Sequence, residues 1–211
     1  MNSATLQANG ISFEFSQKQI FNNFSASIPN GITFVIGDES KGKTTLLRLL
    51  AGDLTAHAGD VTINGFSFSK DIENYKKNVF WIDPSTNAFD QISANDFFDL
   101  QRKLYMDFDE AVLADLIDAL SLKEHLLKSM YMLSAGSKRK VWIAAAFASG
   151  AAVTMIDEPF AALDQASIHR LIDRLEISAL KKGRAWVIAD YVAPKNLSVH
   201  QVINLDEQQN I

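Results

Sequence analysis

One short segment, Gly37-Asp-Glu-Ser-Lys-Gly-Lys-Thr-Thr45, constrains the fold of this chain more than any other part of it. The segment matches the pattern G-x-x-x-x-G-K-[ST] and lies between an apolar run, Ile32–Ile36, and an amphipathic stretch, Thr45–Ala51. We interpret these parts as a buried strand, a phosphate-binding loop and a helix whose N-terminal amide groups point back at the loop. The pattern therefore predicts that the chain binds a nucleoside triphosphate.

The residue types within the loop fit that chemistry. Gly37 and Gly42 let the backbone curl so that its N–H groups face the phosphates. Lys43 is expected to reach the β- and γ-phosphates, and Thr44 is expected to hold Mg²⁺ through its hydroxyl group.

Composition limits the alternatives. The chain has 211 residues, of which 47% are hydrophobic and 21% charged, and this suits one large globular domain. The net charge is −5 with both signs interspersed, so no polybasic face indicates nucleic acid, and we expect no nucleic acid partner. Because cysteine is absent, disulfides and thiolate metal sites are excluded.

Apolar patterning points to a cytoplasmic protein. No early segment combines a basic start with an apolar core of signal-peptide length. The longest mainly apolar stretch, Val141–Ile156, is shorter than a membrane span and is interrupted by Ser149 and Gly150. We interpret it as a buried helix followed by a buried strand.

The N-terminal part of the chain reads as β-structure. Apolar and polar residues alternate between residues 4 and 29, which predicts an antiparallel pair, Ile11–Phe15 with Phe21–Ile28, closed by Pro29–Gly31. Further strands are expected at Gly59–Gly65 and, as a buried strand, at Val79–Ile82.

Helical spacing of apolar residues begins at about residue 93 and continues to 148, which predicts an inserted helical subdomain. Strand and helix then alternate, as in a parallel sheet flanked by helices. We therefore expect an α/β fold in a single domain, residues 1–211. About 1–92 and 149–211 would form the core with an N-terminal antiparallel β subdomain, and about 93–148 the helical subdomain.

A second motif, Ala152–Glu158, is an apolar strand that ends in two carboxylates. Asp157 is expected to lie beside Thr44 and to bind the metal directly or through water. Glu158 is expected to polarise a water for in-line attack on the γ-phosphate, as the catalytic residue. The alternative is a solvated turn before Pro159.

The third motif, Leu133–Lys140, resembles the signature sequence of ATP-binding cassette (ABC) proteins. The resemblance implies that Ser134, Ala135 and Gly136 open a helix and cradle the γ-phosphate of ATP held by a second subunit. Ser134 and Gly136 match the family, whereas Ala135 stands where a second Gly is common. Without the resemblance, the segment would be an ordinary helix cap.

The resemblance extends over essentially the whole chain. Asp164 matches the acid of the family's D-loop, which contacts the partner subunit near the phosphate loop. Phe15 falls where the family keeps an aromatic residue that stacks on adenine, although core packing is the alternative. The family binds ATP and Mg²⁺, and the expected ATP-binding residues are Phe15, Gly37, Asp38, Glu39, Ser40, Lys41, Gly42, Lys43, Thr44 and Thr45.

Three departures from the family pattern bear on activity. At the switch position, where the family places a His that contacts the γ-phosphate, this chain has Asp190 followed by Tyr191. An ionised Asp190 would repel the triphosphate, so either it points away or hydrolysis is slow. The Q-loop Gln is absent, since the sequence there is Asp83–Asn87, and the phosphate loop has Ser40 and Lys41 where Gly and Ser are preferred.

Three functional hypotheses follow from the resemblance. The chain is the ATPase subunit of a transport system, working as a homodimer or heterodimer of cassettes with a separate membrane-spanning subunit and therefore peripheral at the inner face of the membrane. Alternatively, it is a nucleotide-gated assembly subunit that hydrolyses ATP poorly. The third is a cassette acting on nucleic acid or ribosomes, but those proteins generally carry two cassettes and basic linkers, absent here. Short motifs, including Phe80–Ile82 and Asp157–Phe160, are also similar to the small cassettes of haem-export systems in cytochrome c maturation.

Overall fold

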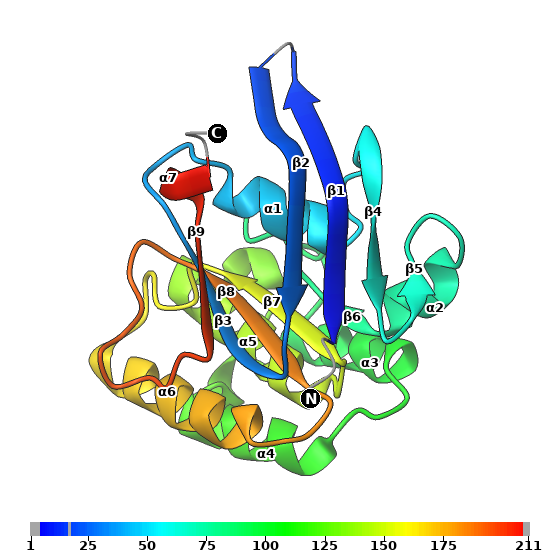
Figure 1. Cartoon of the computed structure of the whole chain (residues 1–211). Helices are drawn as coiled ribbons and strands as arrows, with labels where there is room; N and C mark the ends of the chain where they lie inside the picture. Colours follow the sequence, from blue (N-terminus) through cyan, green and yellow to red (C-terminus); the bar gives the residue numbers. More distant parts are fainter. Residues whose placement is uncertain (1–4, 17, 209–211) are drawn as a thin grey trace.

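Two β-sheets and the helices packed between and around them make up the described part of the chain (Figure 1). The computed structural model describes residues 5–16 and 18–208. Residues 1–4, 17 and 209–211, which include both ends of the domain expected at 1–211, lie outside the described residues.

The first sheet is antiparallel, with strand order β2-β1-β4-β5. Its strands are β1 (Leu6–Phe15), β2 (Lys18–Ile28), β4 (Ala58–Ile63) and β5 (Phe66–Ser67). The expected antiparallel pair is thus confirmed, but its expected closure at Pro29–Gly31 is wrong. Phe15 pairs with Lys18, so the chain reverses between these two residues. Gly31 already belongs to the other sheet, because its N–H donates to the carbonyl of Arg184.

The second sheet is parallel, with order β6-β7-β8-β3-β9. Its strands are β3 (Gly31–Ile36), β6 (Val79–Phe80), β7 (Val153–Asp157), β8 (Ala185–Ala189) and β9 (Gln201–Asn204). The apolar runs expected to be buried strands in β3 and β7 are therefore central strands, covered on both faces, whereas β6 is an edge strand. Val79–Ile82 contributes only two residues to the sheet, fewer than expected.

Helices cover both faces of the parallel sheet, and two apolar cores result. On one face, α1 (Lys43–Leu50) packs between the two sheets through Leu46, Leu47, Leu49 and Leu50. On the other face, Phe34, Trp186 and Ile188 meet the helices of the insert and α6. The remaining elements are α2 (Ile72–Lys77), α3 (Ala94–Leu104), α4 (Glu110–Ala119), η1 (Lys123–His125), η2 (Met130–Met132), α5 (Ala135–Ala148), α6 (Gln165–Ala179) and α7 (Leu205–Gln208).

The insert is helical, as the sequence predicts. It lies between β6 and β7 in the chain and contains α3, α4 and α5. A capping box, in which Ser93 and Asp96 each bond to the other's backbone N–H, starts α3. The buried second half of α5 ends against Arg184, which donates to the carbonyls of Ala146 and Phe147 at 2.9 and 3.1 Å. These contacts fix the insert against the parallel sheet.

Candidate nucleotide site

The phosphate loop connects β3 to α1 at the carboxyl edge of the parallel sheet. Gly42 has φ +94°, a backbone conformation that favours glycine, and a methyl group on it would lie 2.8 Å from Ile20 Cγ2 of β2, which would have to shift. Ser40 also adopts a left-handed conformation, φ +62°, which costs more for Ser than for the Gly that the family prefers. Asp38, Glu39 and Ser40 are exposed at the tip of the loop.

Lys43 is buried under this loop. Its Nζ donates to the carbonyl oxygens of Gly37 at 2.5 Å and Asp38 at 3.0 Å, and it lies 4.3 Å from the centre of the Tyr191 ring. The ammonium is therefore held at the inner side of the loop, where a lysine in this motif meets phosphates.

Thr44 and Asp157 lie together, although 113 positions separate them in sequence. Thr44 Oγ1 donates to Asp157 Oδ2 over 2.5 Å. Parallel pairing explains the contact, because β3 and β7 both pair with β8 and their carboxyl ends meet at one edge of the sheet. In open α/β sheets, ligands bind at that edge.

The two carboxylates at the end of β7 differ in their surroundings. Burial raises the pKa of Asp157, the charge of Glu158 raises it further, and the bond from Thr44 opposes both. Glu158 is half-buried and has φ +47°, a conformation that is uncommon outside glycine. Its N–H donates to the carbonyl of Ala189 at 2.8 Å, and its own carbonyl accepts from the guanidinium of Arg139. The backbone at Glu158 is thus fixed from both sides.

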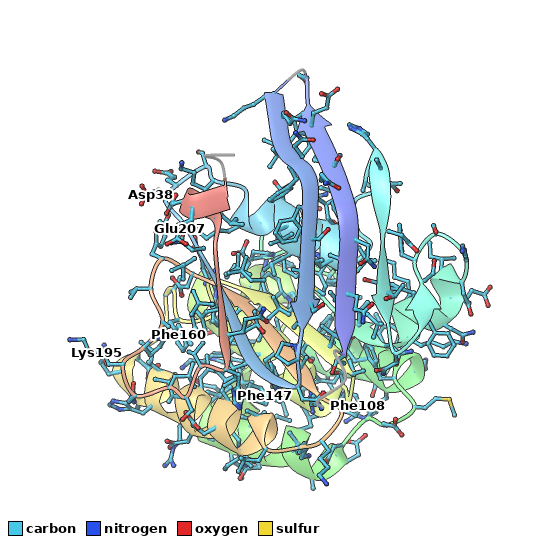
Figure 2. All side chains as sticks on the ribbon, viewed as in Figure 1. Asp38, Phe108, Phe147, Phe160, Lys195 and Glu207 are labelled. Atoms are coloured by element: carbon cyan, nitrogen blue, oxygen red, sulfur yellow. The ribbon has the colours of Figure 1, made fainter. Side chains whose placement is uncertain are left out.

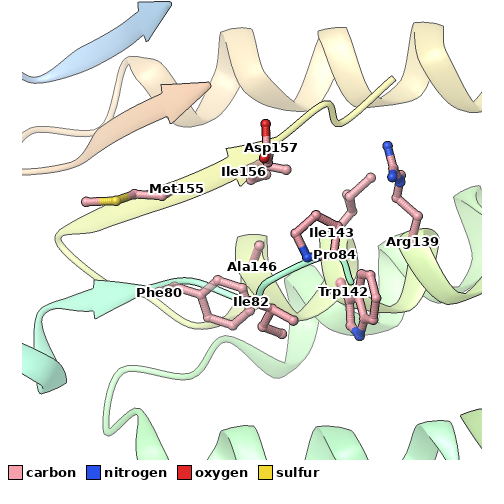
Figure 3. A pocket seen from close by; sticks show the side chains of 10 residues that line it. All are labelled: Phe80, Ile82, Pro84, Arg139, Trp142, Ile143, Ala146, Met155, Ile156 and Asp157. Atoms are coloured by element: carbon pink, nitrogen blue, oxygen red, sulfur yellow. The ribbon is translucent and has the colours of Figure 1, made fainter. Parts of the chain in front are cut away.

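A small cavity of about 30 Å³, enough for one water, lies behind Asp157 (Figure 3). Apolar side chains from α5, β7 and the segment after β6 line most of it, including Ile82, Pro84 and Trp142. Asp157 and Arg139 supply its charged groups. The segment expected to contain the Q-loop therefore reaches the same region as Asp157.

The signature segment forms a second group of contacts, with the loop after Glu158. Ser134 caps α5, and its Oγ accepts from Ser137 N–H at 3.1 Å. Ser134 and Ala135 are exposed, whereas Gly136 lies so close to the carbonyl of Ala162 that a methyl group would collide with it. Lys140 Nζ donates to Asp164 Oδ2 at 2.7 Å, and Asp164 in turn caps α6 by accepting from Ser167 N–H.

A model of the ABC transporter family matches residues 21–161 of the chain. The chain therefore belongs to this family. It is an ATP-binding cassette of the kind found in ABC transporters, with the fold of antiparallel N-terminal sheet, parallel core sheet and helical insert that the family shares.

Curated relatives agree with that assignment. The cassette is 29% identical to the ABC-type transporter ATP-binding protein EcsA of Bacillus subtilis, over 82% of this chain and 71% of EcsA. It is 26% identical to the cytochrome c biogenesis ATP-binding export protein CcmA of Legionella pneumophila, over 92% of this chain and 97% of the relative. The similarity to the small haem-export cassettes is thus confirmed, at a distant level.

Solved structures show the same fold. An ATP-binding subunit of an ABC transporter superimposes with a TM-score of 0.80 at 22% identity, covering 89% of this chain and 80% of its own. An ABC transporter ATP-binding protein of Pyrococcus furiosus gives 0.76 at 22% identity, over 96% and 98%. Among the residues that the structure describes in this cassette, no helix is both long and apolar enough to cross a bilayer.

At the switch position of this cassette, backbone and side-chain contacts hold Asp190 in place. Asp190 continues β8, and its N–H donates to the carbonyl of Val35 at 3.2 Å. Its carboxylate turns back and accepts from the N–H of Tyr191 at 2.8 Å. Burial raises the pKa of Asp190, with a further contribution from the charge of Glu158.

Phe15 lies at the end of β1 and is 45% exposed. Its ring meets that of Phe13 edge-on, with 4.7 Å between centroids. The ring is thus partly free of the core, and stacking on adenine stays a prediction.

Sequence reasoning missed Asp206, on α7. Its carboxylate accepts from the N–H of Asp38 at 3.1 Å and lies 3.6 Å from Lys41 Nζ. Figure 2 labels Asp38 and Glu207, which mark the loop and α7 in that view. The chain's last described helix thus anchors the first residues of the phosphate loop, and no local pattern near Asp206 signals this contact.

Proposed function

We propose that this cassette binds Mg²⁺-ATP at the Lys43 loop, hydrolyses it with Glu158, and thereby powers a separate membrane-spanning subunit through closure of a dimer of cassettes. The bond between Thr44 and Asp157 is the observation that carries this proposal, since it brings the phosphate loop and the carboxylates of β7 to one place. A solvated turn at Asp157, the alternative from the sequence, would not bury that side chain to 8% exposure.

The residues at this place fit Mg²⁺. Thr44 Oγ1 and Asp157 Oδ2 are oxygen ligands, and Mg²⁺ is typically held by one or two carboxylates together with substrate phosphates and waters. When bound, Mg²⁺ would neutralise charge on the phosphate oxygens. In the described part of the chain, no group of three or more His, Asp or Glu side chains forms a separate metal cluster.

Binding and chemistry are divided among the chain's own groups. Lys43 and the backbone N–H groups at the N-terminus of α1 hold the phosphates. Glu158 orients and polarises the attacking water as a general base. Its fixed backbone, held by Ala189 and Arg139, limits where the carboxylate can go.

A second cassette completes the site in this proposal. Ser134, Ala135 and Gly136 act on the ATP of the partner subunit, and Asp164 lies at the interface beside them. The exposure of Ser134 and Ala135 supports this, as does the fold similarity, with a TM-score of 0.74, to an ATP-binding cassette solved as a dimer in a post-hydrolysis state with ADP and Pi. The membrane-spanning partner places the cassette at the inner face of the membrane and determines the cargo.

Size-exclusion chromatography of Glu158→Gln tests the proposal. Without the base, ATP persists, so the variant should elute as a dimer with ATP and as a monomer with ADP. Glu73→Gln, an exposed substitution of the same type on α2, is the control and should behave as the wild type. A Glu158→Gln dimer that forms equally with and without ATP contradicts the sandwich.

A weakly hydrolysing assembly subunit is the second candidate, and the carboxylate at Asp190 favours it. An ionised carboxylate accepts hydrogen bonds and cannot donate one to a phosphate. Steady-state ATP turnover of the wild type beside Asp190→His separates the candidates. Turnover gained only in the variant supports the assembly subunit. Comparable turnover in both proteins shows that Asp190 does not limit the rate of ATP hydrolysis.

A further inference from the structure

Tyr191 is held beside the phosphate loop without being buried in the core. It follows Asp190 at the carboxyl end of β8, yet 55% of its surface is exposed, so burial in the core does not hold the ring. Its ring instead lies over Lys43 Nζ, with 4.3 Å between the nitrogen and the ring centre. A cation at this distance from an aromatic face is attracted to it.

Asp190 and Tyr191 have different roles at the end of β8. The Asp190 carboxylate is bonded to the Tyr191 N–H at 2.8 Å, and the Asp190 N–H is bonded to Val35 at 3.2 Å. Asp190 therefore fixes the turn that leaves β8. Tyr191 is the side chain that this turn directs toward the phosphate loop.

The ammonium of Lys43 has three N–H donors, and backbone carbonyls of the loop occupy two of its contacts. The Tyr191 ring is its third neighbour. In this loop motif, the lysine is the group that β- and γ-phosphates approach. A bound triphosphate and the Tyr191 ring must therefore share or exchange the same ammonium.

We propose that Tyr191 reads the terminal phosphate of ATP: its ring leaves Lys43 when the triphosphate binds, and its phenol hydroxyl donates a hydrogen bond to a γ-phosphate oxygen. This inference rests on the proposed function, because it requires ATP at the Lys43 loop. Asp190 cannot supply that donor, whereas a phenol can. The charge of Glu158, followed by burial and other acids, raises the pKa of Tyr191, so the hydroxyl keeps its proton at neutral pH.

Equilibrium binding of ADP and of AMP-PNP, a slowly hydrolysed ATP analogue with a γ-phosphate, tests the contact. Tyr191→Phe keeps the ring over Lys43 but lacks the hydroxyl. It should weaken AMP-PNP binding about tenfold, as for a hydrogen bond to a charged group, and leave ADP binding within about twofold. Tyr191→His restores a donor and should recover part of the AMP-PNP affinity. If Tyr191 only covers Lys43, Tyr191→Phe will bind both nucleotides as tightly as the wild type, and the inference is overturned.

A spectroscopic measurement gives an independent reading. The chain has four tyrosines, so ¹⁹F NMR of protein labelled with 3-fluorotyrosine should give four signals, and Tyr191→Phe identifies one of them by its loss. That signal should shift more with AMP-PNP than with ADP. Equal shifts with both nucleotides overturn the inference and leave the proposed function intact. If the wild type binds neither nucleotide, both the inference about Tyr191 and the proposed function are overturned.

Discussion

Gly136 in the signature segment lies against the carbonyl oxygen of Ala162, in the loop that follows the catalytic candidate Glu158. This is a backbone contact, with no flexible side chain that could yield. The segment proposed to act on a partner's ATP is thereby packed onto the loop of the chain's own site. A movement of the signature segment should therefore displace the loop after Glu158, and the reverse.

Gly136→Ala should separate these two segments. Because the added methyl meets backbone, we expect the free energy of unfolding to fall by about 1–3 kcal/mol. Chemical denaturation measures this directly. Ala135→Ser, at the exposed neighbouring position, is the matched control and should change stability by less than about 0.5 kcal/mol. Equal stability of Gly136→Ala and wild type would show that the contact gives way freely.

Arg139 should act as a positioning residue for Glu158. Its guanidinium donates to the Glu158 carbonyl, so Arg139→Ala frees the backbone that carries the base. We expect kcat to fall about tenfold, corresponding to about 1.4 kcal/mol, with the ATP dissociation constant nearly unchanged. Lys138→Ala is the control, since this neighbouring cation pairs with Asp90 instead, at 2.6 Å. A loss of ATP affinity without a loss of kcat would argue against positioning.

Arg184 should be needed for folding rather than for turnover. It is buried, and it donates to the last carbonyls of α5, where a cation is favourable at a helix C-terminus. Arg184→Ala removes the side-chain donor to the Phe147 carbonyl and leaves the Ala146 carbonyl with only the Ser149 hydroxyl, and we expect a loss of about 2–4 kcal/mol in the free energy of unfolding. Arg184→Lys, which keeps the charge, should lose less. Urea denaturation compares the wild type, Arg184→Ala and Arg184→Lys. An unchanged denaturation midpoint for Arg184→Ala would refute the stabilising role of Arg184.

The stabilisation from Asp164 should depend on pH. The bond from Lys140, followed by the cap bonds to Ser167, holds the pKa of Asp164 well below its ordinary value. Because the unfolded chain binds this proton more tightly, the stabilisation is fully present above about pH 4 and is lost as the pH falls below it. Asp164→Asn should therefore melt below the wild type at pH 7, by a margin that narrows toward pH 3. Asp173→Asn, exposed on the same helix, makes the same change of charge and is the control.

Local motifs were the predictable part of this molecule. The phosphate loop, the strand before it and the helix after it were all expected, because the glycines and the apolar flanks encode their own geometry. The paired carboxylates were predicted for the same reason, since an apolar run that ends in two acids marks the end of a buried strand. The fold class followed from the alternation of strand and helix.

Long-range contacts were the unpredictable part. The hairpin closure at Pro29–Gly31 is wrong because β1 and β2 pair up to Phe15 and Lys18 at their other end, and because Gly31 pairs with β8 in the parallel sheet, a long-range contact that no local pattern signals. Asp206 lies in no motif, and the signature motif that contains Arg139 does not indicate its contact with Glu158. Both residues fix the loop and the base through contacts that only the folded chain creates. The roles assigned to the site residues stay predictions.

A single-turnover assay of ATP hydrolysis, with enzyme in excess over ATP and Mg²⁺ present, tests the central claim most directly. The format detects even slow hydrolysis. Glu158→Gln should hydrolyse ATP at least about 100-fold more slowly than the wild type while still binding it, and Lys43→Ala should lose binding as well. Equal rates for Glu158→Gln and the wild type, at equal occupancy with ATP, would contradict the claim that Glu158 is the base for hydrolysis of ATP held at the Lys43 loop.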